Sequence, residues 1–85
     1  VHHVIHEVPT FQQRGEQLTA SPPPGIRNHQ FYPSPDFSRA TCLWEGPSLD
    51  AVRDYIDGTL GDSATQEYFV VTEEQATGLP VSQLV

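Results

Sequence analysis

The chain has few of the residues that mark several common classes of protein. Its 85 residues include one cysteine and no methionine, and all 4 basic residues are arginines against 11 acidic ones, for a formal charge of −7. A single cysteine excludes an internal disulfide, a cysteine-based zinc finger and a CxxC redox motif. So few basic side chains argue against nucleic acid as a partner, because phosphates require a positively charged surface.

Long apolar runs are also missing. No stretch approaches the ~20 apolar residues of a membrane-spanning helix, and the negative charge disfavours an anionic membrane surface. The first residues have neither the positive charge nor the apolar segment of a secretory signal. We therefore expect no membrane partner, and the cytoplasm is the expected location.

Four segments are rich in residues that favour extended structure. We expect strands at residues 1–8, 26–33, 40–46 and 67–71. Pro9 closes the first of these, and Gly46 followed by Pro47 stops the third. Pro35 and Asp36 supply turn residues between the second and third strands, which should therefore form a hairpin.

The clearest helix is expected over residues 47–61. Its apolar residues recur every three or four positions and form one stripe, made of Leu49, Val52, Ile56 and Leu60. Ser48 can cap the first turn, and Gly61 is well placed to end the helix.

The segment between the first two strands is less regular. Residues 10–20 offer Thr10 as an N-cap, but Gly15 interrupts them, so one or two irregular helical turns at most are expected. The proline-rich residues 21–25 cannot sustain a helix and should form an extended surface connector.

These elements predict a single α+β domain over 1–85, with a core over 1–72 and a tail over 73–85. The order strand, short helix, strand, strand, helix, strand is the ferredoxin-like split βαβ pattern, with a four-stranded antiparallel sheet and helices on one face. The other face needs cover, because a bare sheet surface would be a large apolar patch. A homodimer that closes two sheets against each other, as a dimeric α/β barrel, supplies that cover and encloses a ligand cavity.

Several stretches together resemble a known family. The segments "CLWEGPS", "LDAVRDYI" and "EYFVV", with "VIHEVP" and "RNHQFYPSPD" before them, are similar to small bacterial proteins of unassigned function that include an actinobacterial nickel-binding member. The likeness covers about residues 4–72 and is best over 40–72. It implies a dimeric ferredoxin-like barrel. It also implies a site for nickel or another divalent transition metal, with His6 and His29 as ligands because they fall on the matching strands.

The first strand raises the question of what its histidines do. With a period of two, His2 and His6 share one face and His3 lies on the other with Glu7. Either pair can form half a metal site that His29 completes, and a solvated polar surface explains the same residues without any metal. We expect His6 to be the functional histidine because it lies deepest in the strand, with His2 and His3 as bystanders.

The expected function is a small dimeric binding protein. Its sheet-face cavity, lined by His6, His29, Trp44 and Tyr68, would hold a metal ion or a small aromatic or apolar ligand. The alternative is a cofactor-free enzyme, such as a cyclase, isomerase or oxygenase, with His6 or His29 as general base. A third hypothesis is a protein-interaction module that docks through the tail. Cys42 alternates with Ala40 and Trp44, which indicates a core thiol.

Overall fold

The computed structural model describes residues 1–80 and has one sheet and two helices. The elements follow the order β1 (His2–Ile5), α1 (Val8–Ala20), β2 (Arg27–Pro33), β3 (Arg39–Glu45), α2 (Leu49–Leu60), a 3-10 turn η1 (Gly61–Ser63) and β4 (Ala64–Glu67). The strands lie side by side in the order β2-β3-β1-β4, and each neighbouring pair is antiparallel. The predicted α+β class and four-stranded antiparallel sheet are therefore confirmed.

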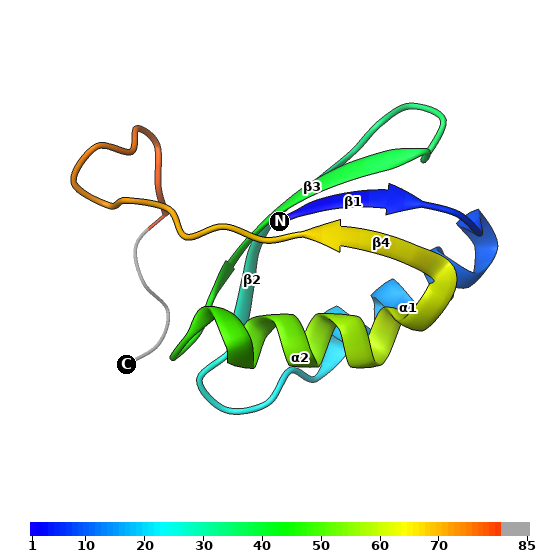
Figure 1. Ribbon diagram of the computed structural model, residues 1–85, viewed down its shortest axis with the longest axis horizontal. Coiled ribbons are helices and arrows are strands. Elements are labelled where there is room, and N and C mark those ends of the chain that lie inside the picture. The colour runs from blue at the N-terminus through cyan, green and yellow to red at the C-terminus, as the bar shows by residue number, and fades with distance from the viewer. Residues whose placement is uncertain (81–85) are drawn as a thin grey trace.

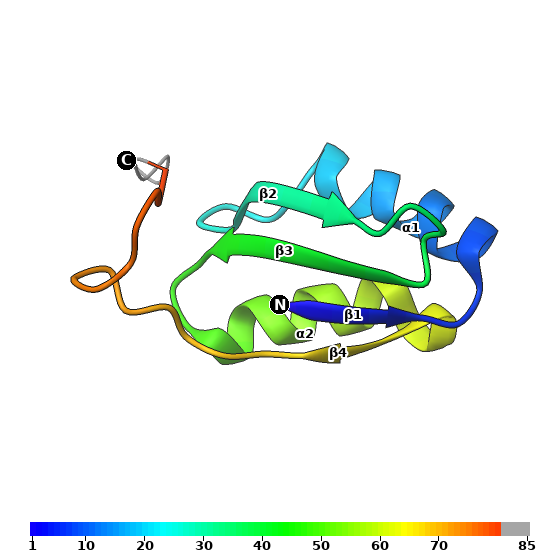
Figure 2. The same ribbon diagram turned by 90° about the horizontal axis from the view of Figure 1, so that it is seen from above.

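Both helices pack against the same face of the sheet, and the opposite face carries no helix of the described residues (Figure 1). Figure 2 shows the four strands spread over α1 and α2. The hydrophobic core fills the space between the two layers and consists of Ile5, Phe11, Leu18, Ala40, Val52, Ile56, Leu60 and Ala64. The sheet thus has one face covered by the helices and one open face, which carries no helix of the described residues.

Helix α2 forms where the sequence predicts it. The side-chain oxygen of Ser48 accepts a hydrogen bond from the Ala51 N–H at 3.1 Å, which satisfies one of the free donors of the first turn. Gly61 ends the helix with a φ of 57°, a conformation that favours glycine. The apolar stripe faces the sheet, and Ile56 and Leu60 are completely buried.

Helix α1 is longer than the sequence predicts. It runs for 13 residues and is regular, whereas one or two irregular turns were expected there. Pro9 lies in the first turn, where backbone N–H groups have no partner within the helix. The N–H that proline lacks is therefore not needed there. Gly15 costs only about 1 kcal/mol in a helix interior, and the burial of Phe11 and Leu18 offsets that cost. The N-cap is Glu7, and the Thr10 hydroxyl donates to its carboxylate at 3.3 Å.

The fourth strand lies earlier in the chain than predicted. It covers Ala64–Glu67, whereas residues 67–71 were expected to form it, and residues 68–71 have no regular structure. Pairing with β1 sets this position, because Ile5 pairs with Ala64 and His2 with Glu67. The high β-propensity of 68–71 is therefore overridden by the length of the neighbouring strand.

Strand β1 is also shorter than predicted, and it ends at Ile5. Its alternation is as expected, since His3 and Ile5 are buried against the helices while His2 and Val4 are exposed on the open face. The other two strands follow the prediction closely.

The described part of the predicted tail, residues 73–80, extends beyond the end of the sheet (Figure 1). Residues 81–85 of that tail lie outside the described residues. Within residues 1–80 there is no helix of the length and apolar character needed to span a membrane.

Candidate functional site

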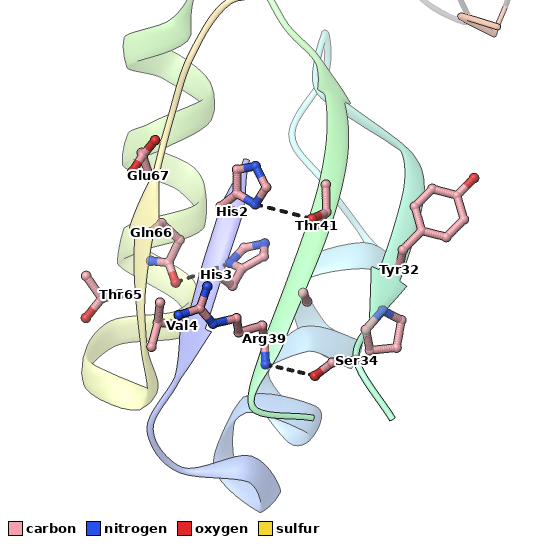
Figure 3. A pocket seen from close by; sticks show the side chains of 12 residues that line it. His2, His3, Val4, Tyr32, Ser34, Arg39, Thr41, Thr65, Gln66 and Glu67 are labelled. Carbon is pink, nitrogen blue, oxygen red and sulfur yellow. Dashed lines mark hydrogen bonds between the residues drawn. The ribbon is translucent and has the colours of Figure 1, made fainter. Parts of the chain in front are cut away.

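A shallow groove of about 780 Å³ lies on the open face of the sheet. Figure 3 shows side chains from all four strands along it. Cross-strand pairing places Tyr32, Thr41, His2 and Glu67 in one row from β2 to β4. Val4 and Arg39 form a second row beside it, since they pair with each other. The groove therefore depends on how the four strands are aligned with one another, and no single segment forms it.

The groove combines apolar surface with one unpaired positive charge. Tyr32 is 62% exposed and Val4 is 42% exposed, so both present apolar surface to the solvent. The His2 ring stacks on Phe69 with a centroid distance of 6.1 Å, and its Nδ1 lies 3.3 Å from the Thr41 hydroxyl. The guanidinium of Arg39 has no ion-pair or hydrogen-bond partner within residues 1–80. These groups can bind an anion that carries an apolar body.

A chain of hydrogen bonds lies on the other side of the sheet, between the strands and α2. His3 Nε2 is 3.1 Å from Cys42 Sγ, and His3 Nδ1 is 3.2 Å from Gln66 Oε1. The Gln66 amide donates to Asp57 Oδ1 at 2.9 Å, and the Tyr68 hydroxyl donates to the same oxygen at 2.6 Å. Side chains from β1, β3, α2 and β4, together with Tyr68 just after β4, thus form one hydrogen-bond network.

Burial keeps the inner end of this network neutral. His3 is 2% exposed and Cys42 is 6% exposed. Burial lowers the pKa of His3 below its usual value, and the hydrogen bond to Gln66 opposes that shift. Burial raises the pKa of the Cys42 thiol to about 11. Burial also raises the pKa of Tyr68, and the hydrogen bond to Asp57 adds to the increase. Imidazole and thiol therefore meet as uncharged groups at neutral pH.

His6 does not line the groove. It follows the end of β1, is exposed, and its Nε2 lies 2.6 Å from the Thr65 hydroxyl. The expectation that His6 lies deepest in the strand is wrong, because β1 ends at Ile5. His3, which was expected to be a bystander, is the buried histidine of this strand.

His29 lies in β2 at the other end of the sheet. Its side chain is 5% exposed, and its Nε2 is 2.9 Å from Glu45 Oε1. Asn28 beside it pairs with Trp44, whereas His6 lies beyond the pairing of Val4 with Arg39. Trp44 and Arg39 are five positions apart in β3, which corresponds to roughly 17 Å along the strand.

His6 and His29 are therefore too far apart to bind one metal ion within a single chain. Over residues 1–80, no group of three or more histidine, cysteine, aspartate and glutamate side chains is arranged to hold an ion. The two histidines do not fit the nickel site that the family resemblance implies. Nickel binding stays a prediction from that resemblance.

Trp44 and Tyr68 do not line the groove, contrary to expectation. Trp44 lies on the helix side with Ala40 and Cys42, packs against the core, and meets Tyr55 edge-on at 6.1 Å. Tyr68 also packs against the core, with its hydroxyl on Asp57. Strand alternation explains Trp44, since the buried residues of β3 share its parity.

Three groove residues were not predicted from the sequence, namely Tyr32, Arg39 and Glu67. Each is an ordinary polar or aromatic residue in its own segment, and only the pairing of strands brings them together. The outward alternation of β1 and β3 was a usable signal, because it places His2 and Thr41 on the face opposite the predicted core.

Comparison of the chain with protein-family models, curated proteins and solved structures found no match.

Proposed function

We propose that the protein is a homodimeric binding protein of the ferredoxin-like class that holds a small aromatic or apolar carboxylate between two open sheet faces. The strand order β2-β3-β1-β4, with helices on one face only, supports the ferredoxin-like assignment. The observation that carries the proposal is the groove on the helix-free face, with an unpaired arginine beside exposed apolar side chains.

The ligand class follows from the groove side chains. Arg39 offers a planar, permanently charged group that binds a carboxylate through two parallel hydrogen bonds. Tyr32 and Val4 of the groove offer apolar and aromatic surface for the rest of the ligand, and Phe69 adds to it where it stacks on His2. Glu67 on the far side of the row disfavours a second negative group, so a monoanion fits best.

Dimerisation follows from the same surface. An open sheet face with exposed Val4 and Tyr32 is the type of patch that soluble proteins cover by association. Closing two shallow grooves over each other converts them into one enclosed cavity.

Ligand binding is tested with 1-naphthoate and its uncharged analogue 1-naphthylmethanol, by isothermal titration calorimetry. We expect naphthoate to bind at least about tenfold more tightly than the alcohol, because a hydrogen bond to a charged group contributes about 1.5 to 3 kcal/mol. Arg39→Gln should remove that preference. Arg53→Gln is the matched control, because Arg53 lies on α2 and pairs with Asp50 at 2.6 Å. Equal binding of both probes, or an unchanged preference in Arg39→Gln, would contradict the proposed ligand class.

The dimer is tested by sedimentation equilibrium. The monomer mass is 9.4 kDa, and we expect about twice that value for the wild-type protein. Val4→Asp places a charge at the centre of the open face and should give a folded monomer, as judged by circular dichroism. A wild-type protein that remains monomeric at millimolar concentration would refute the face-to-face dimer.

The enzyme hypothesis has less support from the geometry. His6 and His29, its candidate general bases, both lie outside the groove, and His29 is held by Glu45. The binding function requires neither residue.

A further inference from the structure

The groove on the open face holds one basic and one acidic side chain. Apart from histidine, Arg39 and Glu67 are the only ionisable residues among the described residues that line it. Within residues 1–80 neither side chain makes an ion pair or a hydrogen bond, so the fold does not neutralise either charge. Both charges are therefore available to a ligand.

The register of the sheet separates these two charges. Arg39 lies on β3 opposite Val4 of β1, and Glu67 lies on β4 opposite His2 of β1. Arg39 and Glu67 are thus two strands apart and offset by two positions along the strands, which corresponds to roughly 12 Å between their Cα atoms. A molecule that contacts both side chains must carry its two polar groups at opposite ends.

The surface between the two charges is largely apolar. Val4 and His2 lie there, because β1 is the strand between β3 and β4 and both side chains point to the open face. The His2 ring is oriented by its stacking on Phe69 and by the Thr41 hydroxyl. Figure 3 shows the Arg39 side chain extending from β3 toward β1. A flat ring system can therefore lie on β1 with one end at the guanidinium.

We propose that the ligand of the groove is a hydroxyaryl carboxylate, with its hydroxyl at the end of the ring system opposite the carboxylate, and that Glu67 selects it by accepting the hydroxyl hydrogen bond. This inference rests on the proposed function and narrows the ligand class of the same groove. Arg39 binds the carboxylate, the rings lie over Val4 and His2, and the hydroxyl donates to Glu67.

The selectivity follows from what a carboxylate can do. It accepts hydrogen bonds and cannot donate them, so a methoxy group at the far end of the ligand offers Glu67 no partner. The Glu67 carboxylate would then lose bound water without gaining a hydrogen bond, which weakens binding. An ammonium group at that end would lose more hydration than a hydroxyl on entering a partly apolar groove. Glu67 is thus a specificity-determining residue, whereas Arg39 acts on every carboxylate.

The test compares 6-hydroxy-2-naphthoate with 6-methoxy-2-naphthoate by isothermal titration calorimetry at pH 7. The hydroxyl keeps its proton at this pH, because a phenol has a pKa of about 10. We expect the hydroxy compound to bind about five- to tenfold more tightly, since a hydrogen bond to a charged acceptor is among the stronger ones. Glu67→Gln should reduce this preference to less than about twofold, because an amide can also donate to the methoxy oxygen.

The two groove charges should have opposite effects on 2-naphthoate, which carries no group at the far end. Arg39→Gln should weaken its binding at least about tenfold. Glu67→Gln should leave its binding unchanged or strengthen it by up to about threefold, because a negative charge is removed from the groove. Glu16→Gln is the matched control, since Glu16 is exposed on α1, on the other side of the sheet, and should bind all three naphthoates like the wild type.

The outcomes separate this inference from the proposed function. If 2-naphthoate binding depends on Arg39 but the hydroxyl preference is absent, or persists in full in Glu67→Gln, the role of Glu67 is wrong and the binding function stands. Tighter binding of 6-(aminomethyl)-2-naphthoate than of the hydroxy compound would also overturn the hydroxyl assignment. If none of the naphthoates binds, the proposed function fails and this inference with it. Glu67 is exposed on the outer strand β4, so we expect Glu67→Gln to fold, as circular dichroism would show.

Discussion

Acidification should destabilise this protein through His3. The side chain is 2% exposed, and burial lowers its pKa below the value of 6.5 that applies to the unfolded chain. As the pH falls through about 6.5, the unfolded chain binds a proton at this position before the folded protein does. The stability that neutral His3 contributes is therefore complete above the pKa of the unfolded chain. It is lost progressively between that pKa and the lower pKa of the folded state.

The size of the effect follows from the linkage of one proton to folding. The free energy of unfolding should fall by at most about 1.4 kcal/mol per pH unit in this range. Asp57 favours the charged imidazole and reduces the slope, whereas His2 and the amine of Val1 increase it. Asp36 does not interfere, because hydrogen bonds from Ser38 and Ser34 lower its pKa to about 2, well below the range of the experiment.

Urea denaturation at pH 7.5, 6.5 and 5.5 measures this slope, with the fluorescence of the single tryptophan as the probe. Trp44 packs against the core, so its emission reports the loss of tertiary structure. His3→Gln, which cannot titrate, should have a flatter dependence of stability on pH than the wild type. His6→Gln removes an exposed histidine and should keep the wild-type slope. The same slope in His3→Gln as in the wild type would show that His3 is not buried in its neutral form.

Two further predictions concern the ends of α2, each measured by urea denaturation at pH 7.5. Ser48→Ala removes the acceptor of the Ala51 N–H and should lower the free energy of unfolding by about 1 kcal/mol, whereas Ser48→Thr should lower it by less. If Ser48→Ala and Ser48→Thr both had the stability of the wild type, the cap would contribute nothing. Gly61→Ala places a Cβ 2.7 Å from Arg14 Nη1 at a φ of 57°, so we expect a loss of more than about 1 kcal/mol. In Gly58→Ala the new Cβ meets no atom within 4 Å, and a gain of about 0.4 to 1 kcal/mol is expected, so a loss there would contradict the reasoning.

The parts of the fold that sequence analysis predicts correctly are those whose signals are local. Helix α2 has its cap residue, its apolar stripe and its terminal glycine within fifteen residues, and each acts as expected. Helix α1 was underestimated because Gly15 is an unfavourable local signal, whereas the packing of Phe11 and Leu18 that offsets it is not visible in the sequence. The same holds for β4, whose limits depend on pairing with β1.

The candidate sites were predicted less well than the fold, for a related reason. Alternation along β1 correctly divided the histidines between the two faces, and Cys42 was correctly assigned to the core. The contact between His3 and Cys42 depends on the register of β1 against β3, in which His3 pairs with Ala40. No residue within either strand reveals that register. A histidine close to the start of a chain is therefore easily mistaken for a solvated one.

The outer strand β2 has a consequence for how copies of this protein can associate. An outer strand offers free N–H and C=O groups on which a foreign strand can pair and extend the sheet sideways without limit. In β2 the register shifts between Asn28 and Gln30, and the strand ends at Pro33, which lacks an N–H. Both features interrupt the template that lateral growth into fibrils would need. The molecule is thereby protected from open-ended polymerisation along this edge.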